Sequence, residues 1–143
     1  TIGETAAEAV SQIEDLLAAL GVEARVRVLG HDQPSWRGLV YPTEKFFPAW
    51  ETDAESAAVR AAVYGARRVL GREPRLHRSA FSSNGCTTSG IFQIPTVGFG
   101  PADEVHSHTV NDQISLAQME PAIAFFALYP YLWITHTGTG GRT

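Results

Sequence analysis

The chain has 143 residues, of which 44% are hydrophobic and 18% charged, a composition typical of a folded globular protein and not of a disordered one. Its formal net charge is −4 and it has no cluster of basic residues, so a nucleic-acid partner is not expected. The longest apolar run, residues 122–133, is shorter than the roughly 18 residues that cross a bilayer and contains Pro130, so no membrane partner is expected either.

The first predicted element is an amphipathic helix over residues 5–20. Thr5 and Glu8 form the Thr-x-x-Glu pattern of a capping box, and Gly21 is typical of a helix end. Apolar residues recur at helical spacing, which predicts one buried face. Residues 22–29 then alternate between apolar and polar or charged side chains, a pattern that predicts a half-buried strand.

Residues 31–50 form a long connection rich in proline, glycine and aromatic side chains. A connection of this length is usually functional or packed on another surface, and the alternative is a loop held by its own aromatic side chains. We expect the boundary between two domains here, with residues 1–50 in the first and 51–143 in the second.

The second half predicts alternating helices and strands. A helix is expected from Thr52, with a second capping box to Glu55, and Gly71 should end it. Later in this half, Pro121 should kink the last helix or move its start. The remaining elements are a strand at 75–81, a short helix at 86–92, a strand at 94–99 and a last helix at 115–133. This order is typical of part of a parallel α/β sheet.

The loop after the strand at 94–99 is rich in possible metal ligands. It follows the carboxyl end of a predicted strand, where open α/β sheets place their active-site groups. Imidazoles and carboxylates are common zinc ligands, although such side chains in a loop can equally be solvated or cap a helix. The residues in question are Asp103, Glu104, His106, His108 and Asp112.

Residues 82–88, Ser-Ser-Asn-Gly-Cys-Thr-Thr, form a second candidate site. Their hydroxyl, amide and backbone N–H groups are suited to hold a carboxylate or oxyanion at a helix N-terminus, and the alternative is an Asn-Gly turn with Ser and Thr capping. Cys86 is the single cysteine, which excludes an internal disulfide and favours a reducing compartment, so a cytoplasmic location is predicted. We expect Cys86 to be a buried structural thiol.

Four stretches, in this order, resemble the carboxyl-terminal part of the co-catalytic zinc peptidase and deacylase family. That family includes acetylornithine deacetylase, succinyl-diaminopimelate desuccinylase and carboxypeptidase G, and the branch most similar is that of peptidase-like hydrolases linked by name to selenium metabolism. The stretches are TIGETAAEAVSQIEDLL, GLVYPTEKFFPAWETD, FSSNGCTTSGIFQIPTVGFGP and SHTVNDQISLAQM.

The resemblance implies an α/β architecture in which a lid domain is inserted into a zinc-binding catalytic domain. Residues 1–50 would be the second half of the α+β lid, through which these proteins often form homodimers. Residues 51–143 would be the carboxyl-terminal β-α segment of the catalytic domain.

The resemblance also assigns roles to single residues. His108 matches the last metal ligand of the family, and His106 falls where the family has no fixed ligand. Asn84 and Gly85 match the turn that contacts the substrate, although the Cys-Thr-Thr that follows departs from many relatives. Asn111 and Asp112 follow the ligand in sequence, and the resemblance implies that they orient it or stabilise its loop without binding the metal themselves.

The family's other metal ligands have no counterpart in this chain, and neither does its Glu-Glu pair, which carries the general base. No catalytic residue is therefore expected here. Two zinc ions, or cobalt or manganese, would activate water in a complete site but would not be held tightly by this chain alone.

Three hypotheses follow. In the first, the chain is part of a metal-dependent amidohydrolase that acts on an N-acyl amino acid or a small peptide, and the isolated chain is inactive. The second is a non-catalytic truncated fragment or dimerisation module that self-associates through the strand at 22–29. The third is a small α/β domain whose resemblance is a coincidence.

Overall fold

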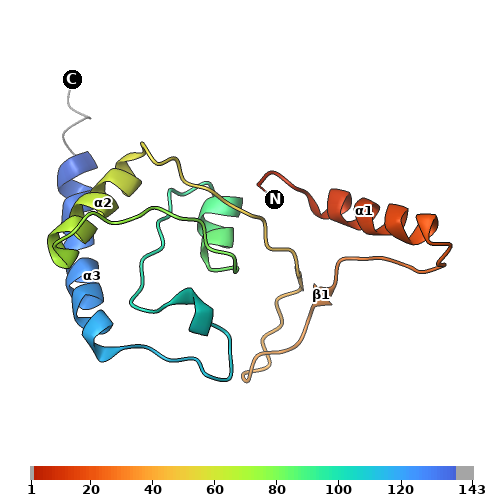
Figure 1. The fold of residues 1–143 in the computed structure, drawn as a ribbon. Coiled ribbons are helices and arrows are strands. Elements are labelled where there is room, and N and C mark those ends of the chain that lie inside the picture. The colour runs from red at the N-terminus through yellow and green to blue at the C-terminus, as the bar shows by residue number, and fades with distance from the viewer. Residues whose placement is uncertain (1, 138–143) are drawn as a thin grey trace. The chain divides into compact units, whose positions relative to one another are not determined.

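A computed structural model describes residues 2–137 of the chain (Figure 1). The chain divides into two compact units, Thr1–Glu51 and Thr52–Thr143, which are described separately. That these units are the lid and catalytic segments stays a prediction. The described part combines helices with one two-stranded sheet, which is compatible with the α/β class. Between residues 2 and 137, none of the helices has both the length and the apolar character that crossing a bilayer requires.

The first unit begins with helix α1, Ala6–Ala19, whose ends are where the sequence predicts them. The Thr5 hydroxyl accepts a hydrogen bond from the Glu8 backbone N–H at 3.2 Å, and the Glu8 carboxylate accepts one from the Thr5 N–H at 2.7 Å. The predicted capping box is therefore confirmed. At the other end, Gly21 has a φ of 66° and its N–H donates to the Ala18 carbonyl, a helix ending that favours glycine.

The rest of the first unit is mostly irregular. Strands β1, Gly30–His31, and β2, Thr43–Glu44, pair antiparallel, with Gly30 opposite Glu44. Ile2 forms an isolated parallel bridge with Ala49. The predicted strand at 22–29 is wrong for the described residues, where this segment belongs to no β-ladder. Alternation favours an extended segment, but a strand forms only where another backbone lies alongside to pair with it.

Helix α2, Ala57–Leu70, opens the second unit later than predicted. Its cap is Ser56, whose hydroxyl accepts a hydrogen bond from the Val59 N–H at 3.3 Å. The box predicted at Thr52 and Glu55 is wrong, because the Thr52 hydroxyl instead donates to the distant Thr96 carbonyl at 2.7 Å. The predicted end is confirmed by Gly71, which has a left-handed φ of 63°.

The core of the second unit lies where α2 packs against helix α3, Leu116–Thr137 (Figure 1). Phe125 of α3 is buried and its ring stacks on Phe99, with 3.9 Å between ring centroids. At Gly65, a Cβ atom would lie 3.0 Å from Leu132 Cδ1, so a hydrogen atom in place of a side chain permits the close approach. The buried small residues of α2 that complete this surface are Ala58, Ala61, Ala62 and Ala66.

Two short helices and extended segments connect α2 to α3. The first is a π-helix, η1, Cys86–Ile91, which agrees with the short helix predicted at 86–92. The second is a 3₁₀-helix, η2, Glu104–His106. The strands predicted at 75–81 and 94–99 are wrong for the described residues, since neither segment pairs with a neighbour there. Helix α3 continues through Pro121, which therefore does not mark its start.

Candidate functional site

The loop that contains His108 lies beside the segment that leads into the Asn84 turn. Glu104 of η2 accepts a hydrogen bond from the Ser79 hydroxyl at 2.7 Å, and the same carboxylate oxygen lies 3.9 Å from Nδ1 of His77. The ring of His108 meets the ring of Phe81 edge to face, with 5.4 Å between centroids. Residues 77–81 and 104–108, which are distant in sequence, are thus joined by three side-chain contacts.

His108 has a side chain exposed to solvent and a backbone in the left-handed region, with a φ of 60°. This conformation is uncommon for residues other than glycine, and histidine adopts it more readily than bulky residues do. Residues held in such conformations cluster at ligand-binding positions. The neighbouring His106 is half-buried in η2, where its N–H donates to the Asp103 carbonyl at 3.1 Å.

The Asn84–Gly85 turn is closed by its own backbone. The Asn84 carbonyl accepts hydrogen bonds from the N–H groups of Thr87 and Thr88, and the Gly85 N–H donates to the Ser83 hydroxyl at 3.2 Å. Because these N–H groups already have partners, the oxyanion-holding role considered for them from the sequence is not supported. Asn84 itself is exposed, as are the neighbouring Ser83 and Thr87.

Below the turn, Gly85 and Cys86 are buried. Cys86 is a free thiol and its predicted burial is confirmed, while its structural role stays a prediction. Of the two threonines that follow, Thr87 is exposed and Thr88 is half-buried.

Asn111 and Asp112 lie in a separate turn that follows His108. Thr109 organises this turn, because its hydroxyl accepts from the Asn111 N–H at 3.2 Å and donates to the His106 carbonyl at 2.9 Å. The Thr109 carbonyl also accepts from the Asp112 N–H at 3.2 Å. Both Asn111 and Asp112 are exposed, and a role behind the metal ligand stays a prediction for each.

The described residues do not by themselves form a metal site. Among residues 2–137, no three side chains of the His, Cys, Asp and Glu type come together in a group that could hold a metal ion. A catalytic zinc site typically has three protein ligands and an open position for water. His108 has the right chemistry and exposure to supply one ligand, and the others would have to come from elsewhere.

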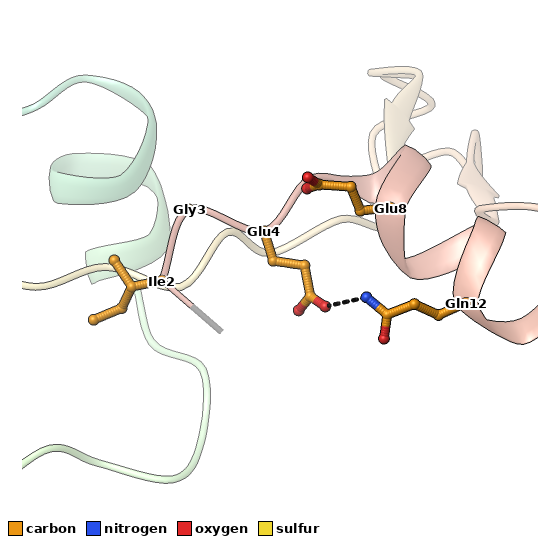
Figure 2. A pocket seen from close by; sticks show the side chains of 5 residues that line it. All are labelled: Ile2, Gly3, Glu4, Glu8 and Gln12. Carbon is orange, nitrogen blue, oxygen red and sulfur yellow. Dashed lines mark hydrogen bonds between the residues drawn. The ribbon is translucent and has the colours of Figure 1, made fainter.

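A shallow hollow at the start of α1 is lined by Ile2, Gly3, Glu4, Glu8 and Gln12 (Figure 2). Its polar groups serve the helix end. Glu4 accepts a hydrogen bond from the Gln12 amide at 3.3 Å, as Figure 2 shows. The pKa of Glu8 is lowered because its carboxylate accepts hydrogen bonds from the backbone and then from the side chain of Thr5. We therefore interpret this hollow as part of the cap and not as a ligand site.

Sequence reasoning did not identify the side-chain hydrogen bonds that stabilise the segments next to the Asn84–Gly85 turn. Thr88 and Thr96 have hydroxyl oxygens 2.7 Å apart, and Thr96 is in turn bonded to Thr52. Gln93, with a φ of 56°, donates its side-chain amide to two carbonyls of η1. Local patterns hold no signal for pairings of this kind, because each threonine has equally good partners within its own segment.

Comparisons with known proteins agree on one family. The sequence model of peptidase family M20/M25/M40 matches residues 6–131. The uncharacterized protein YgeY of two Escherichia coli strains is 35% identical over 134 residues, which cover 94% of this chain and 33% of that protein. A putative LysW-lysine/LysW-ornithine hydrolase of Thermococcus kodakarensis is 36% identical over 78 residues, or 54% of this chain and 22% of that protein. No solved structure gives a significant match.

The chain thus spans about a third of the length of the first of these relatives. The matched range includes the Asn84 turn, the His108 loop, helix α2 and the first part of α3, up to residue 131.

Proposed function

This chain belongs to peptidase family M20/M25/M40, and we propose from that membership that it is part of a metal-dependent amidohydrolase. Its substrate would be an N-acyl amino acid or a small peptide. The observation that carries the proposal is the family match over residues 6–131, which makes coincidental resemblance untenable. The name of the relative from Thermococcus kodakarensis, a hydrolase, supports the same class of reaction.

In this proposal His108 holds one metal ion and Asn84 contacts the substrate. Zinc, or cobalt or manganese in its place, would supply the Lewis acid that polarises an amide carbonyl. The imidazole of His108 is exposed and forms a T-shaped contact with the Phe81 ring, which restricts its orientation. Asn111 and Asp112 would support the loop from its far side. The general base and the remaining ligands would come from parts of a longer polypeptide, as in relatives about three times as long.

The decisive experiment compares His108→Ala with His106→Ala in the native gene product, assayed for metal content and for hydrolysis of a panel of N-acetyl-L-amino acids. We expect His108→Ala to lose metal and to lower kcat/KM more than about a hundredfold, because even changes behind a metal ligand cost about 10- to 100-fold. His106→Ala is the matched control and should retain both. Equal effects of the two substitutions would contradict the role of His108.

The isolated chain gives a second test. Since the described residues supply one ligand, zinc should bind this chain weakly, and the binding should weaken further in His108→Ala. The chain alone should hydrolyse none of the panel. Tight zinc binding that survives His108→Ala would show that another group of residues holds the metal.

We also propose that the first unit pairs with a second copy of the chain, as the lid of the family does. Helix α1 supports this, because none of its residues is buried and apolar side chains are exposed on it, Ile13 (49%) and Leu16 (60%), and at its C-cap, Leu20 (67%). Sedimentation analysis should find a dimer that Leu16→Glu dissociates, whereas Ser11→Glu at an exposed polar position of the same helix should not. A monomeric wild type would contradict the pairing.

A non-catalytic dimerisation module is the second candidate function, and the exposed face of α1 favours it to the same extent. The two candidates differ in one result: a native gene product that forms dimers but hydrolyses no N-acetyl-L-amino acid would be the module. The cytoplasmic location stays a prediction, consistent with the free thiol of Cys86.

A further inference from the structure

Two unusual backbone features flank the Asn84 turn. The π-helix η1, Cys86–Ile91, follows it directly, and π-helical turns are rare and are frequently found at functional sites. Just beyond the end of η1, Gln93 occupies the left-handed position at which helices usually place glycine. A residue other than glycine in this conformation is strained, and the conformation persists only where its surroundings fix it.

The surroundings that fix this segment are specific hydrogen bonds. The Gln93 side-chain amide donates to the carbonyls of Ser89 at 3.0 Å and Gly90 at 3.1 Å, which satisfies the exposed end of η1. The Ile94 N–H then donates to the Thr88 carbonyl at 2.8 Å. The chain therefore folds back along η1 as soon as the helix ends, and this brings Thr96 alongside Thr88.

A series of threonine hydroxyls continues from there to the turn. The Thr88 hydroxyl donates to the Asn84 carbonyl at 3.3 Å, and its oxygen lies 2.7 Å from that of Thr96. The Thr96 hydroxyl has one proton to share between this contact and the Ile94 carbonyl, which lies 2.9 Å away. Thr96 is held in turn by Thr52, whose hydroxyl accepts from the Thr96 N–H at 3.2 Å and donates to the Thr96 carbonyl at 2.7 Å. All three hydroxyls lie in the half-buried layer beneath the exposed Asn84.

We propose that Thr96 is a positioning residue that fixes the Asn84–Gly85 turn for contact with the substrate, through its hydroxyl contact to Thr88. This inference rests on the proposed function, since it assigns the turn to substrate binding. Thr96 does not touch the substrate. It acts through Thr88, and Thr52 keeps its backbone in place.

The geometric part is tested on this chain by amide hydrogen exchange at Thr88 and Ile94. Thr96→Val keeps the shape of the side chain but removes its hydroxyl, so we expect exchange about five- to tenfold faster, the effect of losing about one hydrogen bond. Thr96→Ser keeps the hydroxyl and should exchange as the wild type does. Thr43→Val, which removes a hydroxyl bonded only to the nearby Tyr41 carbonyl, is the control. Equal exchange in Thr96→Val and Thr43→Val would overturn the inference.

The substrate part is tested in the native gene product with N-acetyl-L-amino acids. Thr96→Val should raise KM about five- to tenfold and change kcat less than about twofold, because a turn that binds the substrate acts on ground state and transition state alike. Thr96→Ser lacks the methyl group but keeps the hydroxyl, so its KM should match that of the wild type. A KM raised in Thr96→Ser as much as in Thr96→Val would assign the effect to packing and not to the hydroxyl. A fall in kcat at unchanged KM would overturn the assignment.

Failure of the two proposals is distinguishable. If the wild type hydrolyses none of the N-acetyl-L-amino acids, the proposed function fails together with the substrate part, and exchange alone decides whether the hydroxyls hold the turn. If the wild type is active and Thr96→Val matches Thr43→Val in both exchange and KM, the positioning role fails while the proposed function stands.

Discussion

Helices α1 and α2 are both 14 residues long, yet they are stabilised in different ways. Helix α1 has a reciprocal capping box and a glycine ending, and none of its residues is buried. Helix α2 also ends at a glycine, but its N-terminal cap is a single hydrogen bond to the Ser56 hydroxyl and not a reciprocal box. It buries six residues, all of them alanine, valine or glycine, and packs against α3. Local signals thus suffice to begin and end a helix, but burial requires a partner from elsewhere in the chain.

This difference predicts that the two units lose structure independently. The second unit should unfold as a cooperative core, because its stability comes from burial of apolar surface. The structure of α1 should depend on its end contacts, which are local and exposed to solvent. Four experiments test this contrast, from the largest expected effect to the smallest.

The largest effect is expected for Phe125→Ala. Phe125 is 3% exposed and stacks between Phe99 and Tyr129, so its removal should lower the free energy of unfolding by about 3–5 kcal/mol. Urea unfolding followed by circular dichroism measures this. The neighbouring Phe126 is 56% exposed, and Phe126→Ala should cost less than about 1 kcal/mol. Similar losses in both variants would contradict the core placed between α2 and α3.

Gly65→Val should have the next largest effect. A Cβ atom at this position meets Leu132 Cδ1 at 3.0 Å and the Phe125 ring at 3.5 Å, so a branched side chain would separate α2 from α3. We expect a loss of about 1–3 kcal/mol by the same measurement. Gly98 has open space around its position, and Gly98→Val should stay within about 0.5 kcal/mol of the wild type.

Thr5→Ala should destabilise α1 alone. It removes the hydroxyl that accepts from the Glu8 N–H, a loss of about 1 kcal/mol for a helix cap. Amide exchange should become faster in α1 and stay unchanged in α2, as it should throughout in the control Thr43→Ala. Faster exchange in α2 would mean that the two units are coupled.

Acid should weaken the same cap. Hydrogen bonds from Thr5 lower the pKa of Glu8 below the ordinary value of 4.5, so its contribution is complete above that pH and is lost as the pH falls through the lowered pKa. Backbone chemical shifts of α1 measured from about pH 6 to about pH 3 should report this loss, and Glu8→Gln should abolish it. The probe must be residue-specific, because Arg67 lowers the pKa of Glu73 beside α2 in the same direction.

The sequence predicted those elements that are defined by neighbouring residues. The limits of α1, the end of α2 at Gly71 and the short helix after Gly85 were all confirmed. The start of α2 was wrong by several residues because Thr52 bonds to a carbonyl 44 residues away, and no local pattern reveals that partner. The predicted strands were wrong because alternation indicates an extended backbone but not whether a second backbone lies beside it.

The candidate site follows the same division. Resemblance identified His108 and the Asn84 turn, and the family assignment was confirmed over most of the chain. Their roles stay predictions. The structure adds the contacts around them, a ring contact between Phe81 and His108 and a hydroxyl contact between Thr96 and Thr88. The sequence alone determined both ends of α1, the end of α2, the Asn84 turn and the family, since each depends on residues a few positions apart or on motifs kept in order. Only the tertiary structure decided which faces are buried and which hydroxyls support the turn, because hydrogen bonds and packing join whichever residues the fold brings together.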